Sequence, residues 1–144
     1  MDHVPLSHEV ISRTATRRFT FYWGPAILFA GFIFALSSLS AIPEMPKKSD
    51  KILHFLEYFF LALLLWRAFA CERFWTLESG RVIAVVLIGC LYAASDEIHQ
   101  SYVPGRFASI YDWFADVAGI LGMLTLMVIR LKWRGSGRQS YETI

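Results

Sequence analysis

A short polar stretch interrupts the apolar second half of the chain, where residues 95–106 read SDEIHQSYVPGR. It follows the apolar segment Val82–Leu91, and a second apolar segment, Val117–Ile129, comes soon after it. Asp112 and Asp116 stand just before this second segment. Ionisable side chains next to hydrocarbon are costly to bury, and their default interpretation is a functional site. We therefore treat the polar stretch as the candidate site and the apolar segments as its scaffold.

The composition predicts a small membrane protein with one domain. Of the 144 residues, 56% are hydrophobic, whereas about 45–50% is usual for a globular protein. A helix needs about 20 mostly apolar residues to cross a bilayer. The segments that meet this requirement are Phe21–Leu39, Ile52–Ala70, Val82–Tyr102 and Trp113–Leu131. The sequence thus predicts an all-α bundle of four transmembrane helices and excludes an ordinary soluble fold.

The ends of the chain are more polar than its middle. We expect residues 1–20 to be a mobile cytoplasmic arm, residues 21–131 to be the transmembrane domain, and residues 132–144 to be a cytoplasmic tail. The tail contains Gly and Ser among basic residues, a composition that predicts disorder.

The distribution of basic residues predicts the orientation of the bundle. With four crossings, both termini and the loop near residues 71–81 lie on one side. That side carries Arg13, Arg17, Arg18, Arg67, Arg73, Arg81, Arg130, Lys132, Arg134 and Arg138, and the other side carries Lys47, Lys48, Lys51 and Arg106. Because loops rich in Lys and Arg stay in the cytoplasm, both termini are predicted to be cytoplasmic and the polar stretch to face outward.

Several polar residues are predicted to lie at one depth in the outer half of the bilayer. At 1.5 Å per residue, His54 and Glu57 lie about 6–10 Å below the outer end of the second segment. Asp96 and Asp116 lie about 10 Å below the outer ends of the third and fourth segments. Helical spacing also aligns His54 with both Glu57 and Tyr58. Three helices are therefore expected to bring an imidazole and several carboxylates together.

The same spacing predicts which side chains of the third segment face this site. Tyr92, Asp96, His99 and Gln100 are three or four residues apart and share one face, whereas Glu97 is expected to point elsewhere.

The fourth segment combines acidic and small residues. Asp112 and Asp116 are four residues apart and share a face with Gly119. Small residues let membrane helices approach closely, and those of this segment are Ala115, Ala118, Gly119 and Gly122. Two like charges near hydrocarbon need a compensating cation, proton or basic side chain. Arg106, carried on the Pro104-Gly105 turn, is the available arginine on that side.

Three interpretations of these residues stay open. In the first, they form a hydrogen-bonded salt-bridge network that only stabilises the bundle. In the second, Arg106 holds a phosphate or carboxylate in a bidentate grip, while His54 and Asp96 act as catalytic acid and base. The further substrate-binding residues would then be Lys51, Glu57, Tyr58, Gln100, Asp112 and Asp116. No catalytic nucleophile is evident, because Ser95, Ser101 and Ser109 lack a recognisable triad order, so the sequence leaves enzymatic activity open.

The third interpretation is a metal site. Suitable nitrogen and oxygen ligands are offered by His54, His99, Asp96, Asp112 and Asp116. No compact spacing such as HxxxH supports this interpretation, so the sequence assigns no metal ligand and no cofactor.

The order of these residues resembles that of a known family. The pattern runs Asp50-Lys51-x-x-His54-x-x-x-Tyr58, then Asp96-Glu97-x-x-Gln100-x-x-x-Pro104-Gly105-Arg106-x-x-Ser109-x-x-Asp112-x-x-x-Asp116-x-x-Gly119-x-x-Gly122. It is similar to the VanZ-like family of small bacterial membrane proteins over roughly residues 27–131. The resemblance implies an integral membrane protein of about four or more helices and a link to glycopeptide resistance, teicoplanin in particular. It implies no settled reaction.

We therefore expect a multi-pass protein of the bacterial inner membrane. Its predicted partner is a membrane lipid or a lipid-linked cell-envelope precursor, an anionic amphiphile bound in the outer leaflet and, in one alternative, also processed there. The other alternative is a non-catalytic envelope or assembly module with an unidentified membrane-protein partner. No nucleic-acid partner is expected.

The predicted orientation can be checked by thiol labelling. After Cys90 is replaced by Ala, Phe107→Cys is expected to react with a membrane-impermeant reagent in intact cells, because residue 107 lies outside. Cys71, predicted to lie on the cytoplasmic side, is the internal control and should react only after membrane disruption. The reverse pattern would overturn the orientation.

Overall fold

The computed structural model describes residues 8–40, 47–71, 73–74 and 76–139, with side chains described for 16–40, 49–71, 73–74 and 76–134. Within these ranges the chain forms four α-helices and no strand: α1 (His8–Ser37), α2 (Lys47–Ala70), α3 (Ser79–Gln100) and α4 (Ile110–Gln139). Each contains a stretch long and apolar enough to cross a membrane. The predicted all-α bundle of four crossings is thereby confirmed.

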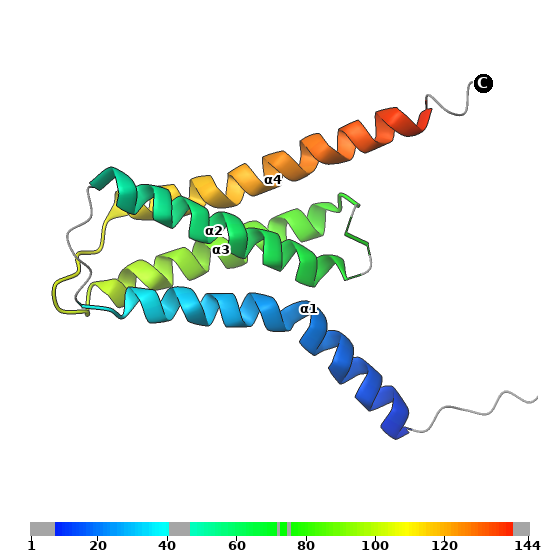
Figure 1. The fold of residues 1–144 in the computed structure, drawn as a ribbon, viewed down its shortest axis with the longest axis horizontal. Helices are drawn as coiled ribbons and strands as arrows, with labels where there is room; N and C mark the ends of the chain where they lie inside the picture. The colour runs from blue at the N-terminus through cyan, green and yellow to red at the C-terminus, as the bar shows by residue number, and fades with distance from the viewer. Residues whose placement is uncertain (1–7, 41–46, 72, 75, 140–144) are drawn as a thin grey trace, which may run out of the picture.

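The helices run in alternating directions, so that α1 begins and α4 ends at the same end of the bundle (Figure 1). We call the opposite end, which carries the connection from α3 to α4, the distal end. The most extensive contact is between α2 and α4, and α2 also packs against α1 and α3. The second helix is therefore the centre of the bundle.

Two helices are longer than the sequence predicted. Helix α1 already begins at His8 and α4 continues to Gln139. Residues 132–139, expected to be disordered, are therefore helical, and residues 8–20 of the expected arm are helical as well. A helix that has formed in the membrane extends at a low cost for each added residue, and neither extension contains a proline. Residues 1–7 and 140–144 lie outside the described part of the chain.

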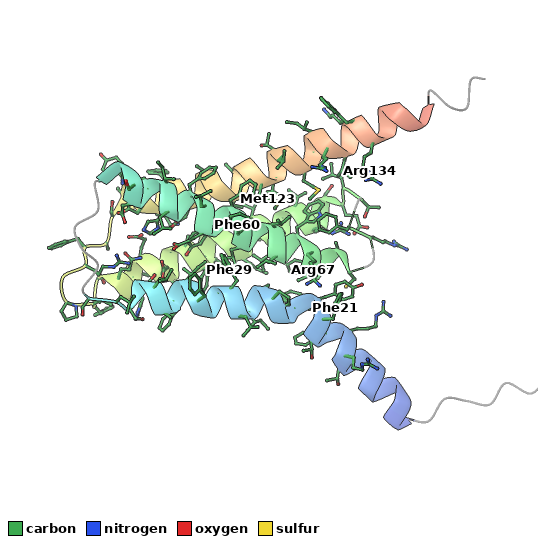
Figure 2. All side chains as sticks on the ribbon, in the orientation of Figure 1. Phe21, Phe29, Phe60, Arg67, Met123 and Arg134 are labelled. Atoms are coloured by element: carbon green, nitrogen blue, oxygen red, sulfur yellow. The ribbon has the colours of Figure 1, made fainter. Side chains whose placement is uncertain are left out.

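The first half of α1 turns away from the bundle (Figure 1). This helix contains Pro25, and a proline bends a helix because it lacks an N–H and clashes with the carbonyl four residues earlier, here that of Phe21. Arg67 of α2 supports the bend by donating a hydrogen bond to the carbonyl of Tyr22 at 3.3 Å. Its guanidinium also lies 4.6 Å from the ring centre of Phe21 (Figure 2).

Helices α2 and α4 are in backbone contact because α4 has glycines on the facing side. A side chain at Gly119 would collide with the carbonyl oxygen of Phe55 and lie 2.9 Å from the amide nitrogen of Phe59. At Gly122 it would lie 3.2 Å from the ring of Phe55. The predicted role of these two glycines in close packing is confirmed, whereas Ala118 is exposed.

At the end opposite the distal end, one buried arginine holds the α2–α3 connection. Arg81 donates hydrogen bonds to the carbonyls of Thr76 at 2.6 Å and Arg73 at 3.1 Å. Its guanidinium lies 5.0 Å from the ring centre of Trp66, whose indole N–H donates to the carbonyl of Phe74 at 3.0 Å. This network closes the bundle at that end without drawing on the candidate site.

The backbone contact at Gly119 predicts a specific sensitivity. Gly119→Ala should destabilise the protein by about 1–3 kcal/mol, because α2 and α4 must separate to admit the methyl group. Gly31→Ala is the matched control, since a side chain there meets no atom within 4 Å. We expect this substitution to increase the free energy of unfolding by no more than about 1 kcal/mol, because alanine favours the helix more than glycine does. Unfolding in detergent compares the two variants, and equal stabilities would contradict the assignment.

Candidate functional site

Six polar side chains of α2, α3 and α4 are buried at the distal end, where α2 and α4 begin and α3 ends. Their exposed fractions lie between 0% and 8%. They are His54 of α2, Asp96, Glu97 and Gln100 of α3, and Asp112 and Asp116 of α4, and we call this group the polar layer. Burying polar groups is unfavourable unless they are hydrogen-bonded or paired, so their partners decide what the polar layer can do.

The most deeply buried pair joins α2 to α4. The Nδ1 atom of His54 lies 2.9 Å from Oδ1 of Asp116, and the two side chains are 6% and 0% exposed. His54 directly precedes Phe55, and Asp116 lies one helical turn before Gly119. The glycine contact described above therefore brings this pair within hydrogen-bonding distance.

A second pair lies one helical turn nearer the distal end. The Nζ atom of Lys51 lies 2.5 Å from Oδ1 of Asp112 and 5.6 Å from the ring centre of Tyr111. The lysine side chain is 44% exposed, so solvent weakens this ion pair more than the buried one. The two pairs form successive cross-links between α2 and α4.

Helix α3 holds its part of the polar layer through different partners. The Gln100 amide donates to Oδ2 of Asp96 at 3.1 Å and lies 3.3 Å from the hydroxyl of Ser37, at the end of α1. Oε2 of Glu97 accepts the backbone N–H of Ser109 at 2.7 Å. Glu97 thus ties the residue before α4 to the end of α3.

Arg106 lies on a tight turn in the α3–α4 connection. Gly105 has a φ of +85°, a conformation that favours glycine, and the Arg106 N–H donates to the carbonyl of Val103 at 3.0 Å. The guanidinium Nε is buried and has no hydrogen-bond partner, and among the described residues no ion pair with Arg106 is present. The Arg106 guanidinium group does, however, interact electrostatically with the half-buried carboxyl group of Glu57.

An apolar hollow opens beside the polar layer, between α3 and the start of α4. Its volume is about 340 Å³, and its lining residues are Ala94, Glu97, Ile98, Ala108, Ser109, Ile110 and Trp113. Glu97 lines this hollow and also belongs to the polar layer, so the hollow and the polar layer are adjacent.

The structure has four helices long and apolar enough to cross a membrane and a polar layer at the distal end. A comparison of the sequence with known protein families agrees with this architecture. Residues 7–131 match the family described as VanZ/LLP1. The chain belongs to the VanZ/LLP1 family. Comparisons with curated proteins and with solved structures gave no significant match. The predicted family resemblance is confirmed, and the chain is a multi-pass membrane protein.

For two residues of this VanZ/LLP1 protein, the prediction of which α3 side chains point toward the site is wrong. Glu97, expected to point elsewhere, is buried in the polar layer. His99, expected within the site, instead stacks on Phe34 at 4.2 Å between ring centres and lies 3.0 Å from the hydroxyl of Ser38. Helix α3 packs against α1, α2 and α4, so side chains on more than one of its faces are buried. A second carboxylate directly after Asp96 was the available sequence signal.

The other predicted site residues lie at or next to the polar layer. Tyr58 is fully buried, and its hydroxyl has no hydrogen-bond partner. Glu57 is half-buried and is influenced electrostatically by His54 and Asp96. Together with Lys51 and Arg106, they extend the polar layer along α2 and the α3–α4 turn. The catalytic and substrate-binding roles assigned to these residues stay predictions.

The buried pair predicts a non-additive response to mutation. His54→Leu alone should cost about 3–5 kcal/mol, because it leaves the Asp116 carboxylate buried without its partner. The double variant His54→Leu/Asp116→Leu should lose less than either single variant, because neither charge remains. Unfolding in detergent with a chelator present measures the cycle.

His99→Leu is the control for loss of a histidine on the same bundle. It removes one hydrogen bond, to a side chain that is not buried, and should cost about 0.5–1.5 kcal/mol. Additive losses in the double variant would mean that His54 and Asp116 do not stabilise each other.

Proposed function

We propose that this VanZ/LLP1 protein binds an anionic amphiphile, of the kind of a lipid-linked cell-envelope precursor, in the outer half of the bacterial inner membrane. In this proposal the distal end faces outward, Arg106 binds the anionic headgroup, and the polar layer supplies hydrogen bonds. The family match and the four membrane-type helices support a membrane-bound role.

The observation that carries the proposal is that the buried Nε of Arg106 has no hydrogen-bond acceptor. Three carboxylates of the polar layer have other partners: Asp112 pairs with Lys51, Asp116 with His54, and Asp96 with Gln100. Glu57 interacts electrostatically with Arg106 but forms no ion pair with it among the described residues. The Arg106 Nε is nevertheless buried without an acceptor. A guanidinium group whose buried Nε lacks an acceptor has a donor to offer, and its planar fork suits the paired oxygens of a phosphate or carboxylate.

The hollow beside α3 supports an amphiphile over a purely water-soluble anion. Most of its lining is apolar, and it borders the same connection that carries Arg106. An acyl or prenyl chain could occupy such a surface from the bilayer while its charged group binds the arginine. Pockets that combine apolar walls with a few polar groups are typical ligand sites.

Processing of the bound ligand would fall to His54 and Asp96. Asp116 orients the imidazole of His54 through Nδ1, an arrangement that suits acid–base work. Ser95 and Ser101 do not suit a nucleophilic role, since their hydroxyls donate to the carbonyls of Tyr92 and Ile98 in α3. Binding is therefore the better-supported part of the proposal.

The rival function is a non-catalytic envelope or assembly module. It is favoured by the pairing in and beside the polar layer, in which His54, Lys51 and Gln100 each bind one carboxylate oxygen, of Asp116, Asp112 and Asp96 respectively. In that case Arg106 contributes only to folding, and a change in susceptibility to glycopeptides such as teicoplanin would arise from interaction with another envelope protein.

Arg106 variants separate the two functions. Arg106→Lys should leave the melting temperature in detergent nearly unchanged but abolish the stabilisation by added anionic lipid extract, because lysine cannot reproduce the bidentate grip. Lipid that co-purifies with the protein, measured by mass spectrometry, should fall in parallel. Arg73→Lys is the matched control, as an exposed arginine at the opposite end, and should retain both effects.

The opposite result would support the rival function. If Arg106→Lys and Arg106→Ala lower the melting temperature equally with and without lipid, the arginine is a structural support and the binding proposal fails.

A further inference from the structure

We propose that His54, Glu97 and Asp116 form a binding site for one divalent transition-metal ion. Each side chain offers one ligand atom, and these three atoms all lie within 4.8 Å of one another. They come from three helices, α2, α3 and α4, and all three residues are buried. The inference goes beyond the proposed amphiphile binding and does not depend on it.

Two unpaired carboxylate oxygens are evidence for a bound cation at this site, independent of the clustering of the three residues. Oε1 of Glu97 and Oδ2 of Asp116 are buried and have no hydrogen-bond partner, in residues that are 8% and 0% exposed. An unsatisfied buried polar atom is unfavourable and is rare in native structures. A cation between these oxygens would satisfy both.

The other oxygen of each carboxylate is already held in place. Oε2 of Glu97 accepts the Ser109 N–H at 2.7 Å, and Oδ1 of Asp116 lies 2.9 Å from His54 Nδ1. The Ser109 contact is an outer contact of the kind that orients metal ligands in known sites, whereas the His54–Asp116 contact joins two of the proposed ligands. Both contacts leave one oxygen of each carboxylate without a hydrogen-bond partner.

The charge around the polar layer also favours a cation. The described carboxylates in and beside it are Asp50, Glu57, Asp96, Glu97, Asp112 and Asp116, and the described permanent cations are Lys51 and Arg106. His54 is neutral when it coordinates a metal, so with every carboxylate ionised six negative charges face two positive ones. A divalent ion would offset part of this negative excess.

The ligand types point to a class of ion. One imidazole nitrogen with two carboxylate oxygens suits Zn²⁺, Fe²⁺ or Mn²⁺ better than Mg²⁺ or Ca²⁺, which prefer oxygen-only sites. Three protein ligands leave a coordination position open, as in catalytic zinc sites. The sequence offered His54 and Asp116 among the possible ligands but not Glu97, and it gave no compact spacing because each ligand comes from a different helix.

A second group, Asp50, His54 and Asp112, shares the same histidine. It is the weaker candidate because Lys51 already neutralises Asp112 and because Asp50 is only partly buried. The two groups can be told apart, since only the first requires Glu97 and Asp116.

The test uses the full chain purified in detergent with an affinity tag that contains no histidine. Metal content is measured by mass spectrometry, and Co²⁺ is titrated into chelator-treated protein while its visible absorption is followed, with displacement by Zn²⁺. Glu97→Gln and Asp116→Asn, which keep side-chain size, should each weaken Co²⁺ binding by more than about 100-fold, since loss of even an outer contact costs about 10–100-fold. Controls are His99→Gln and Asp112→Asn, which should bind like the wild type.

Melting temperatures in the presence of a chelator establish that each variant is folded, and Co²⁺ or Zn²⁺ should raise the melting temperature of the wild type but not of Glu97→Gln. Wild-type protein that takes up neither ion in a saturable way overturns the proposal. So does uptake that survives both Glu97→Gln and Asp116→Asn, or uptake that depends on Asp112 instead. Arg106→Lys should keep full metal binding, so failure of the amphiphile proposal is recognised separately.

Discussion

The close approach of α2 and α4 is the constraint on which the rest of the structure depends. The absence of a side chain at Gly119 lets the α4 backbone rest against the carbonyl of Phe55. In a bilayer, helices gain little from burying apolar surface against one another, so close backbone packing and interhelical hydrogen bonds largely determine association. The contact also sets the spacing of the adjacent side chains, and His54 and Asp116 meet because their helices are this close.

The polar groups of the bundle are not satisfied to the same degree at its two ends. At the end opposite the distal end, Arg81 finds carbonyl acceptors and an aromatic ring, and only its Nε is left without a partner. At the distal end the described atoms without partners are Tyr58 OH, Asp96 Oδ1, Glu97 Oε1, Arg106 Nε and Asp116 Oδ2. Proteins tend to break the rules of polar satisfaction where a ligand is bound, and this asymmetry directs attention to the polar layer.

The two inferred ligands would use different chemistry within a small region. Arg106 offers hydrogen-bond donors to an anion, whereas Glu97 and Asp116 offer acceptor oxygens to a cation. These functions are compatible, because a metal ion with an open coordination position attracts the same phosphate oxygens that a guanidinium binds. Glu97 also lines the apolar hollow, so the acidic ligands are not isolated from the route that an amphiphile would take.

Much of this protein could be predicted from its sequence. Long apolar segments require membrane helices, because only internal hydrogen bonds satisfy a backbone in hydrocarbon, and the spaced polar residues indicated the family and the depth of the polar layer. The sequence did not determine where α1 begins and α4 ends, since polar residues at a helix terminus are compatible with either coil or helix. Nor did it determine that Glu97 faces the site and His99 faces α1. Helical periodicity relates the side chains of one helix to each other, but which of its faces is covered depends on how neighbouring helices pack, and only the tertiary structure decides that.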